Sequence, residues 1–200
     1  MDAVVQQAGN HTADHLYGLA TEHSNPYTVY VAVACSNFGM VNATTVFAHF
    51  WGINHHSNEV LRVPGPQNEG RGSIAALVHI FQTSSPSRSL IVYTVSQYAI
   101  RAFAYGAPGN SARGWQCPNS DLLRLGVGLL QQRTAAVQLR WLSDSDRRQN
   151  IHYKSARGLA LHGLQIGGVG IWDIPHRPLR QEVPTRASLV SARPGTTPKV

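Results

Sequence analysis

The stretch from residue 89 to residue 105 reads SLIVYTVSQYAIRAFAY. Its first seven residues are mostly apolar, β-branched or aromatic, without polar alternation, which is typical of a strand buried on both faces of an α/β sheet. Ser96 follows as a good N-cap, and residues 97–105 predict a helix that ends at Gly106. The junction at Val95 therefore lies at the carboxyl end of a central strand, where ligands usually bind in open α/β sheets.

The segments on either side of this stretch predict one mixed sheet. Three β-rich runs separated by short turns indicate an antiparallel meander before the central strand. The expected elements are strands 27–35, 43–52 and 58–63, a helix capped by Ser73, strand 89–95, helix 97–105, a helix from residue 119 or 120, strand 135–142 and helix 154–164. We expect an α/β fold whose five-stranded sheet has three antiparallel strands followed by two parallel ones, with helices on both faces.

Composition suggests a single core with a tail at each end. The 200 residues are 42% hydrophobic, which suffices for one ordinary core. We expect an N-terminal arm (1–25), a domain (26–166) and a basic, Pro/Arg-rich, largely disordered tail (167–200). The two cysteines, Cys35 and Cys117, lack metal-ligand spacing, so an intracellular, reducing location is expected. No apolar run is long enough to span a membrane, and no membrane partner is expected.

The charge balance permits a polyanionic partner. The formal net charge is +7 and the pI is about 9.9. Charged residues make up only 14% of the chain, so the excess reflects a scarcity of acids as much as an abundance of bases. Charge therefore allows nucleic-acid binding without requiring it.

Five fragments carry a resemblance to a known family. They are AVACSNFG (32–39), PGPQNEGRGSIAAL (64–77), YTVSQYAI (93–100), GW followed by NSDLL (114–123) and ARGLA (156–160). In order and spacing they are similar to DGACSNNG, PGPQTNQRAELTAL, YTDSQYVI, GW with N-x-DLL, and ADxLA of the ribonuclease H family. The chain most resembles the fungal type 1 members, and the resemblance implies the same fold from about residue 27 to residue 163.

The resemblance also implies a catalytic set of three aspartates and a glutamate that hold two magnesium ions. The matching positions are Ala32, Ser73, Val95 and Arg157, none of which is acidic. Magnesium requires carboxylate and water oxygens, and a two-metal mechanism needs anionic ligands against the repulsion between the ions. We therefore expect a degenerate member, a pseudoenzyme that is not an enzyme and that uses no metal or cofactor.

Other acids leave an alternative open. The acids between residues 27 and 163 are Glu59, Glu69, Asp121, Asp144 and Asp146. A relocated site would combine Glu69 with Asp144 or Asp146, and a partner could also complete a site. The alternative function is thus an active, metal-dependent ribonuclease H. His49 and His79 lie inside expected elements and are interpreted as structural residues.

The resemblance further implies a surface for an RNA/DNA hybrid. Hybrids present phosphates and 2′-hydroxyls, which polar and cationic side chains can read without contacting bases. Arg157 would place a guanidinium where the family holds a metal. The expected binding residues are Asn37, Arg71, Ser96, Gln97, Arg113, Trp115, Asn119 and Arg157. The first interpretation is that the chain is a scaffold or binding module whose partner is an RNA/DNA hybrid, RNA or a protein. This interpretation includes a role of the chain as a structural protein of a fungal virus or mobile element.

Overall fold

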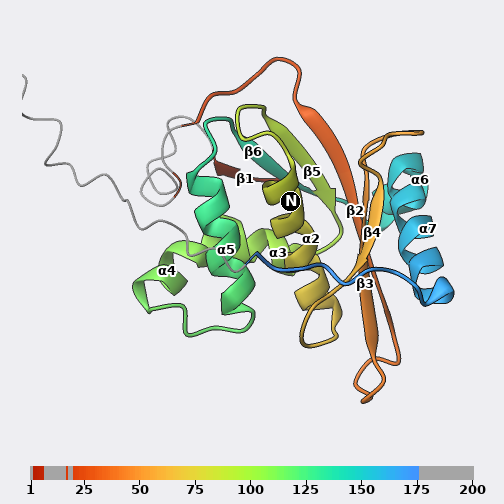
Figure 1. Ribbon diagram of the computed structural model, residues 1–200. Coiled ribbons are helices and arrows are strands. Elements are labelled where there is room, and N and C mark those ends of the chain that lie inside the picture. The colour runs from red at the N-terminus through yellow and green to blue at the C-terminus, as the bar shows by residue number, and fades with distance from the viewer. Residues whose placement is uncertain (1, 7–16, 18–19, 176–200) are drawn as a thin grey trace, which may run out of the picture.

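The computed structural model describes residues 17 and 20–175, together with the backbone of residues 2–6. A mixed sheet of six strands forms the centre of this described part (Figure 1). The strands are β1 (Asp2–Gln6), β2 (Tyr27–Ser36), β3 (Thr44–Phe50), β4 (Glu59–Arg62), β5 (Leu90–Thr94) and β6 (Val137–Trp141). Their spatial order is β1-β6-β5-β2-β3-β4, in which β2, β3 and β4 form an antiparallel meander, β2, β5 and β6 are parallel, and β1 is antiparallel to β6.

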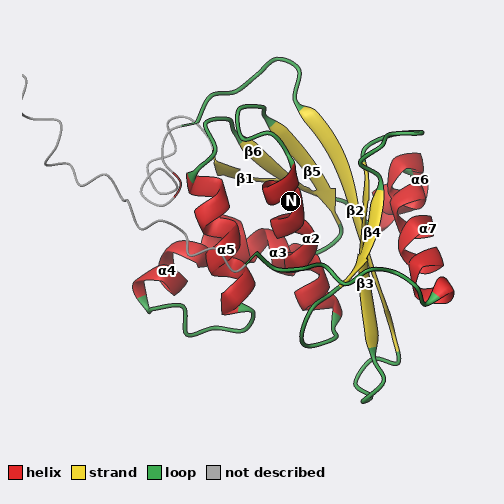
Figure 2. Ribbon diagram, viewed as in Figure 1, coloured by secondary structure: helices red, strands yellow, loops and turns green. Residues whose placement is uncertain are grey.

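Helices cover both faces of the sheet (Figure 2). They are α2 (Glu69–Thr83), α3 (Gln97–Arg101), the π-helical turn η1 (Ala102–Gly106), α4 (Ala107–Ala112), α5 (Ser120–Gln131), α6 (Asp144–Gln149) and α7 (Ile151–Ile166). On one face, α2 packs on β2 and β3 and is itself covered by α5; on the other, α7 packs on the same two strands. The expected α/β fold with helices on both faces is confirmed, and β1 adds a sixth strand at one edge. None of the helices in the described ranges combines the length and apolar character needed to cross a membrane.

The central strand forms as the sequence predicts, and the next helix starts at Gln97 as expected. Its predicted end at Gly106 is wrong, because the π-helical turn η1 leads directly into α4. Leu90 and Val92 of β5 belong to the core under α2 and α5, while Tyr93 packs against the smaller core under α7. Both faces of β5 are thus covered, which explains its unbroken apolar character. The Ser96 hydroxyl accepts a hydrogen bond from the Ala99 N–H at 3.2 Å and caps α3.

The first long helix begins earlier than predicted. Asn68 caps α2 by accepting a hydrogen bond from the Arg71 N–H at 2.8 Å. Ser73 lies inside the helix, where its hydroxyl donates to the Glu69 carbonyl at 2.8 Å, so its expected role as the cap is wrong. Asparagine and serine cap about equally well, and the structure uses the one that stands closer to the preceding Pro-Gly turn.

Two expected loops contain short helices. Residues 106–118 include α4, and residues 143–150 include α6. A capping box starts α6, because Ser143 accepts from the Asp146 N–H and the Asp146 carboxylate accepts from the Ser143 N–H. The last helix, α7, also begins before the expected residue 154, since Asn150 caps it by accepting from the Tyr153 N–H at 2.9 Å.

The packed domain reaches beyond the expected limits of 26 and 166. Tyr17 is buried, and its hydroxyl donates to the Phe103 carbonyl at 2.7 Å. Trp172 is only 4% exposed, and its backbone N–H donates to the Arg62 carbonyl at 3.1 Å. The expected arm thus supplies core and sheet residues, and the first part of the expected tail closes over β4. The rest of that tail, from residue 176, lies outside the described residues.

Candidate nucleic-acid interface

Three of the four positions matched to the family's carboxylates are packed as ordinary structural residues. Ala32 and Val95 belong to the small core under α7, together with Ala156. Ser73 is 6% exposed, and its hydroxyl is bonded to the backbone of its own helix. Alanine and valine carry no ligand atom, so a magnesium site at these positions would need oxygens from elsewhere.

The fourth position, Arg157, is exposed on α7 and contacts Tyr153 one turn earlier. Burial raises the pKa of the Tyr153 hydroxyl, while the charge and the hydrogen-bonding guanidinium of Arg157 oppose that rise. The carboxylate of Glu69 acts on the same hydroxyl and adds to the rise. The start of α2 and the first turns of α7 are therefore close enough for their charges to act on the same hydroxyl.

The other acids of the expected relocated site have local partners. The Asp144 carboxylate lies 3.1 Å from the Arg147 guanidinium. Hydrogen bonds from the Ser143 side chain and backbone lower the pKa of Asp146, which holds its carboxylate in the cap of α6. Among these acids, Glu69 is the one whose charge acts on Tyr153, the residue that Arg157 contacts.

A hydrogen-bonded network joins the starts of α2, α3 and α5. The side-chain amide of Asn119 donates to the Tyr98 hydroxyl at 3.1 Å, and its carbonyl oxygen accepts from the Arg71 guanidinium at 3.4 Å. Arg71 also donates to the Pro64 carbonyl at 2.7 Å and to both carboxylate oxygens of Asp121. We call Arg71, Tyr98, Asn119 and Asp121 the junction network. Arg71 is 5% exposed, so it positions the network, and the half-exposed Asn119 and the exposed Tyr98 face solvent.

Ser96 and Gln97 lie next to the junction network at the start of α3. The Ser96 hydroxyl is used in capping, and the Gln97 side-chain carbonyl accepts from Arg101 at 3.4 Å. A Cβ atom placed on Gly70 would lie 3.4 Å from the Tyr98 ring, so α2 and α3 approach closely here. The starts of α2, α3 and α5 are therefore close together, and the binding role of Arg71, Ser96, Gln97 and Asn119 stays a prediction.

Trp115 and Arg113 border the same surface on the connection from α4 to α5. Trp115 has a left-handed backbone, with φ of 63°, and its half-buried ring packs against the main core. A bulky residue in this conformation carries strain of about 1–3 kcal/mol, and such strain clusters at functional sites. Arg113 is exposed, and its guanidinium donates to the Asn110 side chain at 2.9 Å.

Asn37 lies in the exposed turn after β2, also with a left-handed backbone (φ 51°). Its carbonyl accepts from the Met40 N–H at 2.9 Å and closes the turn. The end of β2 is tied to the start of α2 through β3, because Thr45 pairs with Cys35 and its N–H donates to the Gln67 side chain at 2.7 Å. Asn37 thus extends from the strand end that adjoins the start of α2.

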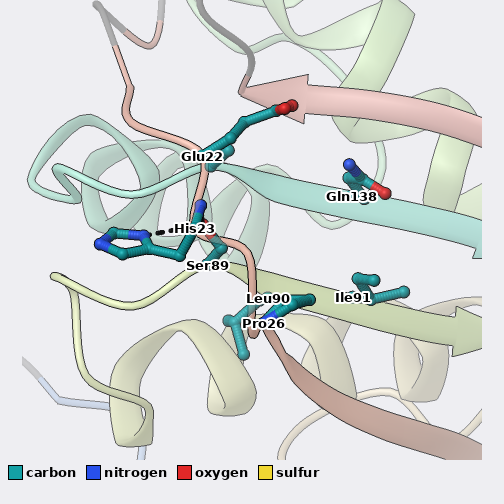
Figure 3. Close-up of a pocket in the computed structure, with 8 residues that line it drawn as sticks. Glu22, His23, Pro26, Ser89, Leu90, Ile91 and Gln138 are labelled. Atoms are coloured by element: carbon teal, nitrogen blue, oxygen red, sulfur yellow. Dashed lines mark hydrogen bonds between the residues drawn. The ribbon is translucent and has the colours of Figure 1, made fainter.

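An open groove of ≈ 440 Å³ runs beside the junction network. Tyr98 and Arg101 line one side of it, Asn110 and Cys117 another, and Leu123 also contributes. A second hollow of ≈ 40 Å³ lies at the opposite, amino-terminal end of β5, where His23 Nδ1 is 3.0 Å from the Ser89 hydroxyl (Figure 3). The second hollow has room for about one water molecule, so the groove is the larger of these two recesses and has ligand size.

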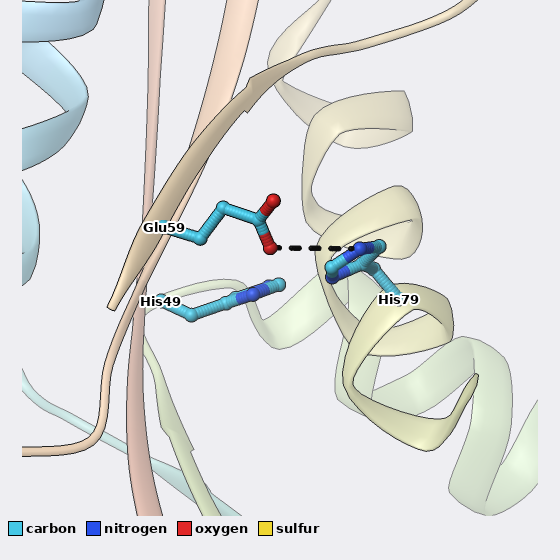
Figure 4. Close-up of side chains that lie close together, drawn as sticks. All are labelled: His49, Glu59 and His79. Atoms are coloured by element: carbon cyan, nitrogen blue, oxygen red, sulfur yellow. Dashed lines mark ion pairs between the residues drawn. The ribbon is translucent and has the colours of Figure 1, made fainter. Parts of the chain in front are cut away.

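The sequence interpretation missed a cluster on the far half of α2. His49 of β3 is paired directly with Glu59 of β4, and His79 of α2 faces both (Figure 4). The polar turn between the two strands predicts their antiparallel pairing, and the register of that pairing places the two side chains on one face of the sheet. The helical partner could be found only from the packing of α2 on that face.

Curated relatives and solved structures are both similar to this chain. Ribonuclease H1 of Mus musculus and Ribonuclease H1 of Rattus norvegicus are each 32% identical to the chain over 141 residues, which is 68% of this chain and 50% of each relative. The solution structure of the PFV RNase H domain matches with a TM-score of 0.53 and 13% identity, over 71% of this chain and 97% of that domain. The chain has the ribonuclease H-like fold. Native Prototype Foamy Virus Protease-Reverse Transcriptase matches 70% of this chain and 21% of that chain, with a TM-score of 0.55 and 14% identity.

The curated relatives agree with this fold, and the chain is similar to Ribonuclease H1 over the matched 141 residues. The chain spans about half the length of the curated relatives that it matches. No protein-family model matches it. The expectation that the chain is not an enzyme is wrong, because the curated relatives are named Ribonuclease H1 and the solved neighbour is an RNase H domain, which points to an enzyme family.

Proposed function

We propose that this ribonuclease H-like domain binds an RNA/DNA hybrid across the surface formed by the junction network. The observation that carries the proposal is the position of Asn119, whose amide links Arg71 of α2 to Tyr98 of α3. The link unites residues named from separate sequence motifs, and it leaves solvent-facing amide and phenol groups side by side. Such groups donate to phosphate and sugar oxygens, which fix a hybrid in register.

One cation and an aromatic ring border this surface, and a second exposed cation lies on α7. Arg113 and Arg157 are exposed, and Trp115 is half-buried. Exposed guanidinium groups match phosphate geometry and lose little hydration free energy on binding, because guanidinium is only weakly hydrated. The groove of ≈ 440 Å³ between α3 and α5 continues the surface and supplies depth for a backbone or a sugar. Arg71 has a positioning role and does not contact the hybrid, because its buried guanidinium is bound to the Asp121 carboxylate.

A second candidate function is hydrolysis of the RNA strand. The observation that favours it is the name of the curated relatives, Ribonuclease H1. Because Ala32 and Val95 offer no ligand atoms, hydrolysis would rest on other carboxylates, and Glu69 is the acid whose charge acts on Tyr153 next to Arg157. A metal held there would need oxygens from the substrate or from a partner in addition to this carboxylate.

The binding proposal is tested in EDTA, where divalent ions cannot support cleavage. Fluorescence anisotropy of a labelled hybrid, duplex RNA, duplex DNA and single strands at two salt concentrations gives the affinity and its salt dependence. We expect the hybrid to bind at least about tenfold more tightly than duplex DNA, because its 2′-hydroxyls add polar contacts. Equal affinity for all four nucleic acids, or no binding, would contradict the proposal, and absence of binding would direct attention to a protein partner.

The hydrolysis candidate is tested separately by adding magnesium or manganese to the same labelled hybrid. Cleavage of the RNA strand that disappears in Glu69→Gln, but persists in Asp144→Asn, would support a site built on Glu69. Cleavage that is equal in both variants would exclude that site. Because binding is measured in EDTA and cleavage with metal, failure of one candidate leaves the other measurable.

A further inference from the structure

The cluster of His49, Glu59 and His79 places three metal-ligating side chains at one point between the sheet and α2 (Figure 4). One ligand atom from each residue lies within 4.8 Å of the other two. Two of the residues are neighbours across the β3–β4 ladder, and the third comes from a helix that packs on that face. The cluster is far along α2 from Arg71, so it is separate from the junction network.

The hydrogen bonding of His49 leaves one ring nitrogen free to bind a ligand. Its Nε2 lies 3.0 Å from the Ala76 carbonyl oxygen. A carbonyl can only accept, so Nε2 carries the proton and donates, and Nδ1 keeps its lone pair. Histidine ligands of metals are usually oriented in this way, by donating the other ring N–H to a backbone carbonyl or carboxylate.

His79 has no hydrogen bond to its ring among the described residues. Its Nδ1 is buried without a partner, and its Nε2 lies 3.7 Å from the Glu59 carboxylate, beyond hydrogen-bond distance. The residue is 7% exposed, and a buried polar nitrogen without a partner is rare in folded proteins. Because Nε2 is the nitrogen that lies 3.7 Å from the Glu59 carboxylate, Nε2 faces a ligand placed between His79 and Glu59.

Burial acts on the pKa of both imidazoles in the same direction. Burial is the main cause that lowers the pKa of His49 to about 3, with the neighbouring His79 adding to the effect. Burial also lowers the pKa of His79 to about 4. The carboxylate of Glu59 is the one anion in the cluster, and its side chain is 46% exposed, so an ion can enter from solvent along this side chain.

We propose that His49, Glu59 and His79 bind a divalent transition-metal ion, with zinc as the ion of choice. Two imidazole nitrogens and one carboxylate oxygen form a donor set that suits zinc, with a water molecule completing a tetrahedron. The three ligand atoms now lie within 4.8 Å of one another. Zinc bond lengths of about 2.0 Å require that the separations between these atoms shorten to roughly 3.3 Å. The long, partly exposed Glu59 side chain can supply most of that movement.

The bound ion joins three elements and strengthens a weak edge. The outermost strand of this side, β4, has only four residues. A metal held by β3, β4 and α2 cross-links that strand to the main core. Trp172 contacts His79 edge-on, with ring centroids 5.6 Å apart, and covers the cluster from the C-terminal side. The ion therefore acts as a structural clamp, and its binding free energy adds to the stability of the fold.

The test uses the full chain after removal of metal by chelation and dialysis. Titration with cobalt is followed by visible absorption, titration with zinc by calorimetry, and the thermal midpoint is measured with and without zinc. We expect one equivalent to bind, tetrahedral cobalt bands, and a rise in the midpoint with zinc. Glu59→Gln keeps the shape of this exposed side chain but removes the anion, and it should weaken zinc binding at least about tenfold.

The matched control is His55→Gln/His56→Gln, which removes an exposed, stacked pair of histidines whose rings lie 4.7 Å apart. This double variant should bind zinc and cobalt as the wild type does. A His79→Gln variant that is folded by circular dichroism should lose the cobalt bands. Unchanged binding in Glu59→Gln, loss of binding in the His55/His56 double variant, or no binding by the wild type would each overturn the proposal.

Discussion

The guanidinium of Arg71 and the carboxylate of Asp121 form a two-pronged salt bridge that fastens α2 to α5. The two contacts are 2.6 Å from Nη2 to Oδ2 and 3.0 Å from Nη1 to Oδ1. The Arg71 side chain is 6% exposed, whereas that of Asp121 is 53% exposed. Because a buried guanidinium needs a partner, the bridge fixes the junction network on which the proposed hybrid surface depends.

Asp121→Asn should destabilise the domain by about 1–2 kcal/mol at pH 7, because the buried Arg71 charge loses its anion while the partly exposed carboxylate limits the loss. Urea unfolding measures the difference. Asp144→Asn is the control, since Asp144 and Arg147 are both exposed, and it should change stability by less than about 0.5 kcal/mol. Equal effects of the two substitutions would contradict the structural role of Arg71.

The Asp121 contribution should depend on pH in a defined direction. Hydrogen bonding to Arg71 is the main cause that lowers the pKa of the Asp121 carboxyl in the folded protein. The stabilisation is therefore complete above the ordinary aspartate pKa of about 3.9 and is lost as the pH falls through the lower, folded value. The difference in the free energy of unfolding between the wild type and Asp121→Asn should stay constant from pH 7 to about pH 5 and should shrink below pH 4. A gap that grows on acidification would contradict this assignment.

Asn119→Gly should weaken hybrid binding about five- to tenfold while leaving the domain folded. Glycine accepts the left-handed backbone at this position (φ 57°) but removes the amide that contacts Arg71 and Tyr98. Asn54→Gly is a matched control, because Asn54 has the same φ of 57° in the turn between β3 and β4. Anisotropy in EDTA gives both affinities. A loss of the same size in Asn54→Gly would show that the effect is not local to the junction network.

Arg157→Gln should lower hybrid affinity. It should also reduce the slope of log affinity against log salt concentration by about one, as expected for the loss of one phosphate contact. Arg88→Gln is the control, because Arg88 lies before the amino-terminal end of β5, where its guanidinium contacts the Asn25 carbonyl and the Tyr27 ring. This variant should retain the wild-type slope. An unchanged slope in Arg157→Gln would remove Arg157 from the binding surface.

Gly126→Ala should destabilise the domain by about 1–3 kcal/mol through overpacking. A Cβ atom at Gly126 would lie 2.7 Å from the Phe103 ring and 3.0 Å from Val78. Gly158→Ala is the opposite case, since its Cβ would meet nothing within 4 Å on the exposed side of α7, and it should stabilise by about 0.5–1 kcal/mol. Thermal and urea unfolding measure both. Stabilisation by Gly126→Ala would contradict the close packing of α5 against Phe103.

The central part of the fold was predictable because local and global signals agree there. The apolar run before Ser96 and the capping serine itself each indicate the strand–helix junction, and both are confirmed. The start of α2 was misplaced because Asn68 and Ser73 are both good caps, and only the packing of the chain selects between them. Burial of Trp172 was missed because a single aromatic residue in a Pro/Arg-rich segment carries no periodic signal.

The sequence motifs name the candidate site residues, which stay predictions, but not the contacts between them. The motifs named Arg71 and Asn119, but a binding role for Arg71 does not reveal that Asp121 holds its charge. The His49–Glu59 pair depends on strand register, and the third member, His79, depends on how α2 rotates against the sheet. Contacts between elements that are distant in sequence decide these features, and a single sequence does not encode them locally.

Amide chemical-shift mapping tests the proposed hybrid surface most directly. The 15N-labelled full chain is titrated with a short RNA/DNA hybrid in EDTA, with duplex DNA of the same sequence as the reference. The largest shifts should fall at the turn after β2, at the starts of α3 and α5, and at residues 113–119. Shifts confined to the β4 edge, to the amino-terminal end of β5, or to no coherent surface would contradict the placement of the hybrid on the junction network.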